Sequence, residues 1–178
     1  MTGPVETELR LWLDKLAIRD VLERYMRYND DLAADRIAEL FDEDARFQVM
    51  GQVHAGRDAI RAMFDRDGAN RPPWTAAGQL FSQPASVHIC SNPVIDVDGD
   101  TASAESDFLV VRRDPDGRAR PALVGRYRDR LRRLADGRWV IYTRTGVSVA
   151  RPGEEHTDSE WARALGRMPD SERARLRT

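Results

Sequence analysis

Three Asp-Gly pairs punctuate the second half of the chain, and they restrict the fold more than any other feature. They lie in DGD at 98–100, DPDGRAR at 114–120 and ADGR at 135–138. Asp-Gly favours the tight turns that join antiparallel strands, because glycine readily adopts the positive φ angles that such turns require. The segments around the pairs are rich in β-branched and aromatic residues, so we expect four consecutive strands in one antiparallel sheet. The predicted strands span 85–97, 101–113, 123–131 and 139–150.

The first third of the chain has a helical period instead. Apolar residues recur at helix-like spacing over 6–27, and the period resumes over 32–45 after the turn residues NDD. ARFQVMGQVHAG at 45–56 alternates and predicts a strand, whereas RDAIRAMFDRD at 57–67 predicts a third helix. The stretch 68–84 is rich in glycine, proline and small residues, which indicates a long loop that could cover the mouth of a pocket.

Three helices followed by a meander of strands predict an α+β fold. We expect a cone-shaped α+β barrel, in which the three N-terminal helices pack on a curled, mainly antiparallel sheet and enclose a deep pocket. The 178 residues fit one domain, which we place at 1–150. The tail at 151–178 carries a narrow apolar stripe of Trp161, Leu165 and Met168. A short helix cannot bury such a stripe alone, so we expect the tail to pack on the body or on a neighbouring protomer.

Composition argues against several kinds of partner and cofactor. The net charge of −2 offers no basic footprint for nucleic acid, and the apolar runs are too short to cross a membrane. The N-terminus lacks the basic start and continuous apolar core of a signal peptide, so we expect a cytoplasmic protein. Cys90 is the only cysteine and the three histidines are far apart, so neither an internal disulfide nor a zinc site is expected.

The predicted strand at 123–131 has one mainly apolar face and one charged face. Leu123, Tyr127 and Leu131 share the apolar face with two further residues, Gly125 and Asp129. The other face carries a row of arginines, which we interpret as a solvent-exposed or subunit-facing surface. These arginines are Arg126, Arg128, Arg130 and Arg132.

Arg144 lies in YTRTG on the last predicted strand. Strict alternation places it on the face opposite Trp139 and Ile141, where it would be a solvated outer residue. A β-bulge before it would instead turn it inward as a pocket cation. We favour the outer face.

His88 lies in SVHICSN, a mostly apolar, β-prone stretch, and two interpretations are open for it. It is either a core histidine bonded to a main-chain carbonyl or an acid–base group, because the ordinary pKa of histidine lies near neutral pH. His54 and His156 are weaker candidates, since they lie in a turn and in the tail. Cys90 has the same strand parity as His88 and could line the same pocket, although a lone cysteine usually acts as a small buried hydrophobe.

The order of elements and four phrases of sequence resemble the SnoaL-like branch of the nuclear-transport-factor-2-like superfamily. The phrases are LAIRDVLERYMRYNDD, ELFDEDARFQVMG, VHICSNPVIDVDGDTASAES and GRYRDRLRRLADGRWVI, and the likeness runs from about Leu13 to Val149. Within this branch the chain is similar to scytalone dehydratase, bile-acid dehydratase and hexachlorocyclohexane dehydrochlorinase. Their pockets hold an aspartate from the end of the first helix and a histidine from the sheet. The resemblance assigns these roles to Asp30 and His88, with Asp31 as the aspartate if the helix end is shifted by one residue.

The resemblance also implies that pocket tyrosines bind or polarise the substrate. Tyr25 and Tyr28 lie on the helix that would supply them, and Tyr127 lies on the apolar face of its strand. Each could equally be a core or lining residue. Asp30 likewise has a plain alternative as a turn or cap residue at a helix end.

A His–Asp pair of this kind eliminates water or halide without a metal or an organic cofactor. The sequence therefore predicts a cofactor-independent dehydratase acting on a small hydrophobic oxygenated metabolite, such as a polyketide, steroid or aromatic compound. We expect a homodimer or homotrimer. One alternative is an isomerase or cyclase that uses the same pair or Asp107. Another is a non-catalytic ligand-binding protein, or the small subunit of a ring-hydroxylating oxygenase.

Overall fold

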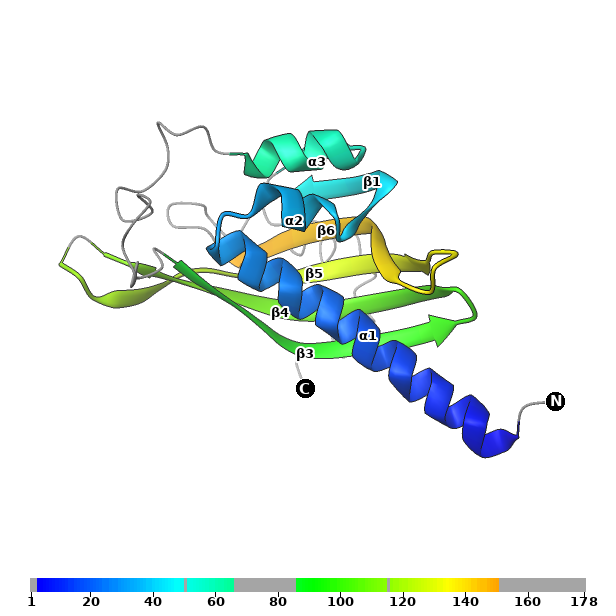
Figure 1. Cartoon of the computed structure of the whole chain (residues 1–178). Coiled ribbons are helices and arrows are strands. Elements are labelled where there is room, and N and C mark those ends of the chain that lie inside the picture. Colours follow the sequence, from blue (N-terminus) through cyan, green and yellow to red (C-terminus); the bar gives the residue numbers. More distant parts are fainter. Residues whose placement is uncertain (1–2, 50, 66–85, 115, 151–178) are drawn as a thin grey trace, which may run out of the picture.

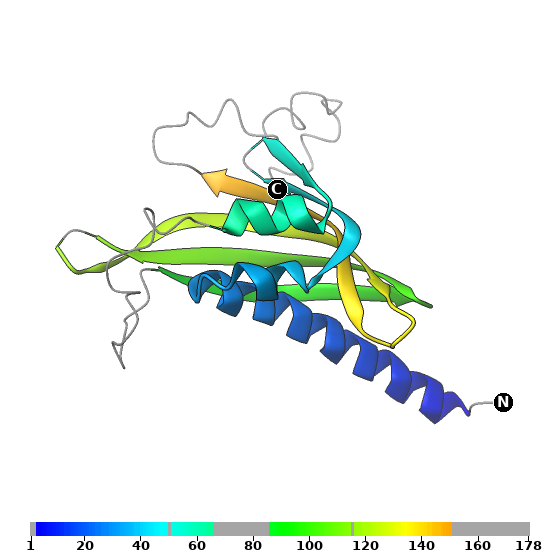
Figure 2. The same ribbon diagram turned by 45° about the horizontal axis from the view of Figure 1, so that its top comes forward.

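The computed structural model describes residues 3–49, 51–65, 86–114 and 116–150. Helices cover one face of a curled sheet, and α1 runs across that face along β3 (Figures 1 and 2). The helices are α1 (Pro4–Asp30), α2 (Ala34–Ala38) and α3 (Arg57–Phe64). The strands are β1 (Phe41–Val49), β2 (Gln52–Ala55), β3 (Ser86–Asp98), β4 (Thr101–Arg113), β5 (Ala119–Arg133) and β6 (Trp139–Ala150).

The six strands form one sheet in the order β2-β1-β6-β5-β4-β3. Strands β3 to β6 are consecutive antiparallel neighbours, and β1 adds to β6 in parallel. At the Asp-Gly turns the φ angles of Gly99, Gly117 and Gly137 are 58°, 80° and 88°, values that favour glycine. The predicted α+β class and four-strand meander are confirmed, although the six strands of the described ranges form a curled sheet that does not close into a barrel.

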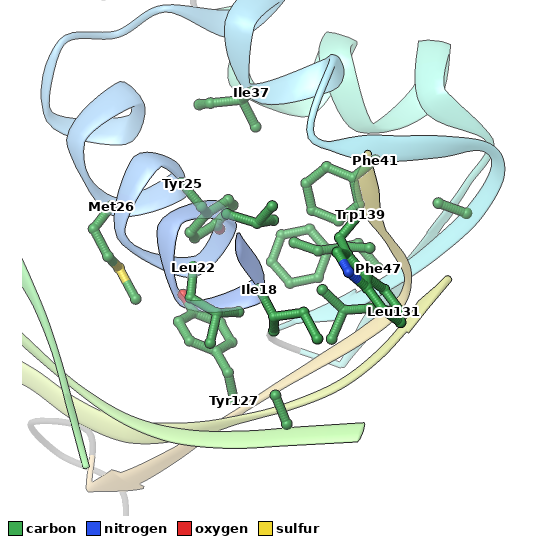
Figure 3. Close-up of a cluster of buried hydrophobic side chains, with 14 of the residues drawn as sticks. Ile18, Leu22, Tyr25, Met26, Ile37, Phe41, Phe47, Tyr127, Leu131 and Trp139 are labelled. Carbon is green, nitrogen blue, oxygen red and sulfur yellow. The ribbon is translucent and has the colours of Figure 1, made fainter. Parts of the chain in front are cut away.

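The core lies between the concave face of the sheet and the helices (Figure 3). Tyr25 of α1 is central to it, with edge-to-face contacts to Phe41, Phe47, Phe64 and Tyr127 at ring-centroid distances of 5.8 to 6.2 Å. Edge-to-face pairs place the positive edge of one ring against the negative face of another, so they add to the burial of apolar area. The position of Tyr25 over the sheet is therefore tightly specified.

A buried ion pair fixes α1 to the sheet. The Arg133 guanidinium of β5 donates two hydrogen bonds to the Asp14 carboxylate, and the indole N–H of Trp139 donates a third. Arg133 also lies over the Trp139 ring, 4.5 Å from its centroid. These bonds give Asp14 the partners that a buried carboxylate requires, so they set where the helix crosses the strands.

The segment after α2 differs from the prediction. The sequence pattern predicts a helix over 32–45, but α2 ends at Ala38 and Phe41 begins β1. Pairing with β6 overrides the local helical pattern, because it buries Phe41 and Ala45 completely.

The predicted loop at 68–84 and the tail at 151–178 lie outside the described residues. None of the helices in the described ranges is long and apolar enough to span a membrane.

Candidate active site

The end of α1 and the start of β3 meet at a hydrogen-bonded pair, Asp30 and His88. The His88 Nδ1 lies 2.7 Å from the Asp30 Oδ1. The main-chain N–H of His88 also donates to both carboxylate oxygens, at 3.1 and 3.0 Å. Only 5% of the Asp30 side chain and 12% of the His88 side chain is exposed. The structure therefore brings together the two residues that the resemblance selected, 58 positions apart in sequence.

This geometry selects one tautomer of the imidazole. An ionised carboxylate only accepts hydrogen bonds, so Nδ1 must carry the proton that it donates to Asp30. The lone pair of the neutral ring is then on Nε2, which has no hydrogen-bond partner within the described part of the chain. Asp31 does not take the role of Asp30, because it is the exposed C-cap residue of α1.

A second polar cluster lies on the same concave face, deeper in the core. The Arg144 guanidinium of β6 donates to the Asp129 carboxylate of β5 through Nε at 2.7 Å and Nη2 at 2.9 Å, and neither side chain is exposed. The guanidinium carbon lies 4.1 Å from the ring centroid of Tyr25 and 4.4 Å from that of Tyr127. Figure 3 shows these tyrosines extending toward each other from α1 and from the sheet. The cation is thus held by one carboxylate and two aromatic rings.

One donor of this cluster is left over. Arg144 Nη1 is buried and has no hydrogen-bond partner among the described residues. A buried, unpaired N–H of a charged group is unfavourable, so such a group marks a position where an acceptor atom would bind. Sequence reasoning missed this site, since it assigned Arg144 to the outer face.

That assignment is wrong because β6 contains a bulge. Leu131 pairs with Ile141 and Arg130 pairs with Thr143, so Tyr142 has no partner on β5. The extra residue reverses the alternation and turns Arg144 inward. Asp129, which alternation correctly places on the inner face, was the available signal: a carboxylate on an apolar strand face needs a buried cation opposite.

Burial keeps two tyrosine hydroxyls and one thiol of this region protonated. It raises the pKa of Tyr25 well above its ordinary value, and it also raises the pKa of Tyr127 and of the Cys90 thiol. The tyrosine hydroxyls are therefore neutral groups, and Cys90 is a thiol rather than a thiolate nucleophile. The nearby Arg144 cation lowers the thiol pKa of Cys90, but the larger effect of burial raises it.

Two glycines let aromatic rings lie flat on the sheet beside these clusters. A Cβ on Gly125 would come within 2.4 Å of the Phe108 ring, and a Cβ on Gly146 within 2.9 Å of the Tyr127 ring. The Phe108 and Tyr127 rings are in turn only 4.5 Å apart. The glycines thus provide the space in which an aromatic floor forms on the concave face.

The remaining candidates are placed elsewhere. The hydroxyl of Tyr28 accepts hydrogen bonds from Arg24 and Arg36, so it belongs to a separate cluster. Asp107, the alternative base, alternates with the buried residues of β4 and accepts a hydrogen bond from the exposed Arg126 at 2.7 Å.

The row of arginines on β5 lies on the outer face, as predicted, and several of its members pair with acidic residues there. In the ranges that the structure describes, no three metal-ligating side chains gather in a way that could hold a metal ion.

Comparisons with known proteins agree with this architecture. No curated protein matches the chain. A nuclear-transport-factor-2-like protein with a cystatin-like fold from Novosphingobium aromaticivorans is 26% identical, with a TM-score of 0.71 over 94% of this chain and 99% of that one. A Mycobacterium tuberculosis protein of unknown function is 26% identical, with a TM-score of 0.64 over 82% of this chain and 76% of that one.

A further N. aromaticivorans structure, provisionally assigned as a scytalone dehydratase, is 24% identical. Its TM-score is 0.62 over 81% of this chain and 89% of that one, and at this identity the likeness shows the fold alone. The family model of the SnoaL-like domain matches residues 10–145, which is most of the chain. This protein therefore belongs to the SnoaL-like domain family.

Proposed function

We propose that this protein is a cofactor-independent lyase of the dehydratase type. Its substrate is a small hydrophobic oxygenated metabolite, such as a polyketide, steroid or aromatic compound, and it works in the cytoplasm as a homo-oligomer. The observation that carries the proposal is the 2.7 Å contact between Asp30 and His88 Nδ1, which leaves the Nε2 lone pair available as a base. Membership of the SnoaL-like family, which includes dehydratases, supports it.

The reaction uses His88 as base and then as acid. Nε2 removes the proton from the carbon next to a carbonyl, and the electron pair of that C–H bond forms the new double bond as the C–O bond at the β carbon breaks. The departing hydroxide takes the proton back from the imidazolium and leaves as water, so the histidine is regenerated. Asp30 holds the tautomer and stabilises the imidazolium between the two transfers.

Arg144 completes the site as the donor for an oxygen of the substrate. Removal of a proton next to a carbonyl places negative charge on the carbonyl oxygen, and a fixed donor in a water-poor environment stabilises that charge. The unpaired Nη1 and the neutral hydroxyls of Tyr25 and Tyr127 are the donors of the second cluster. The Phe108 ring and the aromatic floor provide a surface that suits a hydrophobic substrate.

The test separates proton abstraction from elimination. A panel of aryl β-hydroxy ketones, beginning with 4-hydroxy-4-phenylbutan-2-one, is incubated with the protein in D2O and followed by NMR and mass spectrometry. We expect loss of water, and we expect His88→Gln to lower the rate on the order of 100-fold or more. Asp30→Asn should lower it as well, whereas Asp31→Asn, one residue away and exposed, is the matched control.

The other outcomes distinguish the rival functions. Exchange of the α proton for deuterium without loss of water would favour an isomerase or cyclase that uses the same pair. Binding of a ligand with neither reaction would favour a non-catalytic ligand-binding protein or an oxygenase subunit. A His88→Gln variant that retains the full rate would refute the assignment of the base.

A further inference from the structure

Helix α1 carries apolar residues on two opposite faces, and only one of these faces packs on the sheet. Ile18 and Leu22 of the core face are fully buried. At about 100° per residue, four other apolar residues lie on the far side of the helix, near 180° from the core face. We call them the α1 seam: Val5, Leu9, Trp12 and Leu16, which are 80%, 58%, 57% and 60% exposed.

The seam has the residue spacing of a coiled-coil interface, and it ends abruptly at Leu16. Its residues follow one another at intervals of four, three and four, the alternation of d and a positions in a heptad. Beyond the seam, the same side of α1 carries the exposed charged residues Arg19, Glu23 and Arg27. Exposed apolar side chains, including Leu11 and Leu13 beside the seam, are thus confined to the part of α1 before Ile18. An exposed apolar patch of this kind is typical of an interface.

The seam is also accessible, and its C-terminal end is anchored to the sheet. The first turns of α1 extend past the end of the sheet in both views (Figures 1 and 2). The helix is held in place from Asp14 onward by its bonds to Arg133 and Trp139. A partner would therefore meet a helix that is already formed, which reduces the ordering entropy lost on binding.

We propose that the α1 seam is a dimer interface, in which the same segment of a second copy packs against it in antiparallel orientation. Antiparallel pairing places Leu9 against the partner's Trp12 and Val5 against the partner's Leu16, and the two bodies then lie at opposite ends of the paired helices. The seam of twelve residues is about 18 Å long. Such a small interface predicts dissociation in the micromolar range.

Charge complementarity selects the antiparallel arrangement. In that register the flanking Glu8 faces the partner's Lys15, and by symmetry the contact occurs twice. Within the described part of the chain neither residue has an ion pair, and the Lys15 ammonium lies 5.7 Å from the ring centroid of Trp12, beside the seam. In a parallel pair Lys15 would face Asp20 instead, which is already paired with Arg24 at 2.5 Å.

Sedimentation velocity of the full chain across 1 to 100 μM tests the interface, with roughly micromolar dissociation expected for the wild type. The variant Leu9→Glu/Leu16→Glu should be monomeric throughout that range, with an unchanged circular dichroism spectrum. Val124→Glu, a substitution of an exposed residue on the outer face of the sheet, is the matched control and should leave the dimer intact.

A charge-reversal cycle tests the orientation. Glu8→Lys and Lys15→Glu should each weaken the dimer roughly tenfold, and the double variant should restore it. A monomeric wild type would overturn the proposal, and would be the result if the tail at 151–178 covered the seam of its own chain. A dimer that survives Leu9→Glu/Leu16→Glu but not Val124→Glu would overturn it in favour of the sheet face. Failure of the double reversal to restore the dimer would overturn the antiparallel orientation.

Discussion

Replacement of Asp129 by asparagine should destabilise the protein far more than the same change at the surface. Asparagine keeps the shape of the side chain and one acceptor oxygen, but it removes the negative charge beside Arg144. The guanidinium, which cannot lose its proton, would then be a buried cation without a counter-charge. The expected effect is therefore electrostatic rather than a loss of packing.

The structure sets the size of this effect. Both side chains are fully buried and joined by two hydrogen bonds of 2.7 and 2.9 Å. Breaking a buried pair by removal of one partner costs about 3 to 5 kcal/mol. The rings of Tyr25 and Tyr127 still face the cation after the change, so we expect the lower end, about 3 kcal/mol. For a chain of 178 residues this lowers Tm by roughly 6 to 12 °C.

Urea unfolding monitored by tryptophan fluorescence measures the difference. The matched control is Asp107→Asn, because Asp107 accepts a bond of the same 2.7 Å length from Arg126 but is 34% exposed. We expect that variant to lose about 1 kcal/mol or less. An Asp129→Asn variant as stable as Asp107→Asn would refute the reasoning. The double variant Asp129→Leu/Arg144→Met should recover part of the loss, since an apolar pair of similar volume needs no counter-charge.

Two further predictions concern the stability of the Asp42→Asn variant at acidic pH and that of the Gly125→Ala variant. The Arg132 guanidinium lowers the pKa of Asp42 from 3.8 to about 2, so the stability from this pair is present above about pH 4 and is lost as the pH falls toward 2. Urea unfolding at a series of acidic pH values should show a smaller decline for Asp42→Asn than for the wild type. Gly125→Ala would place a Cβ 2.3 Å from the Val147 carbonyl oxygen, so the free energy of unfolding should fall by about 1 to 3 kcal/mol. A Gly125→Ala variant with wild-type stability in urea would contradict the close approach.

The parts of the fold that local sequence determines were predicted closely. Strands β4 and β6 begin and end at the predicted residues, and each begins within two residues of an Asp-Gly pair. Strand β5 also follows an Asp-Gly pair, but at 119–133 it is longer at both ends than the predicted 123–131. The strand after α2 was not predicted, because FDEDA carries charges that fit a helix end. This strand forms through parallel pairing with β6. That pairing joins positions about a hundred residues apart, which no local pattern contains.

The two polar clusters of the site also differ in how far the sequence predicted them. From the residues alone, His88 could be either a core histidine or a catalytic group. Only the resemblance predicted Asp30 as its neighbour. The structure supplies the contact, while the catalytic role of the pair stays a prediction. The resemblance did not predict the inward position of Arg144. The face of the sheet on which Arg144 lies depends on Tyr142, which has no partner on β5.

The bulge at Tyr142 shows why a sequence pattern could not settle that face. On β1, the residues between Phe41 and Arg46 oppose Tyr142 alone, because Phe41 pairs with Ile141 and Arg46 pairs with Thr143. The bulge is thus accommodated by irregular pairing on both neighbouring strands. Arg132 lies over the exposed Tyr142 ring, 4.7 Å from its centroid, and its guanidinium also binds Asp42 in the irregular part of β1.

These outer contacts hold the extra residue on the solvent side, and the next inward position then falls on Arg144 instead of Thr143. The sequence does carry a trace of the irregularity. Trp139, Val140 and Ile141 are three apolar residues in succession, a run that strict alternation of apolar and polar residues does not predict. All three are buried. An arginine that follows such a run, with an aspartate on the inner face of the preceding strand, is better interpreted as one half of a buried ion pair than as a solvated residue.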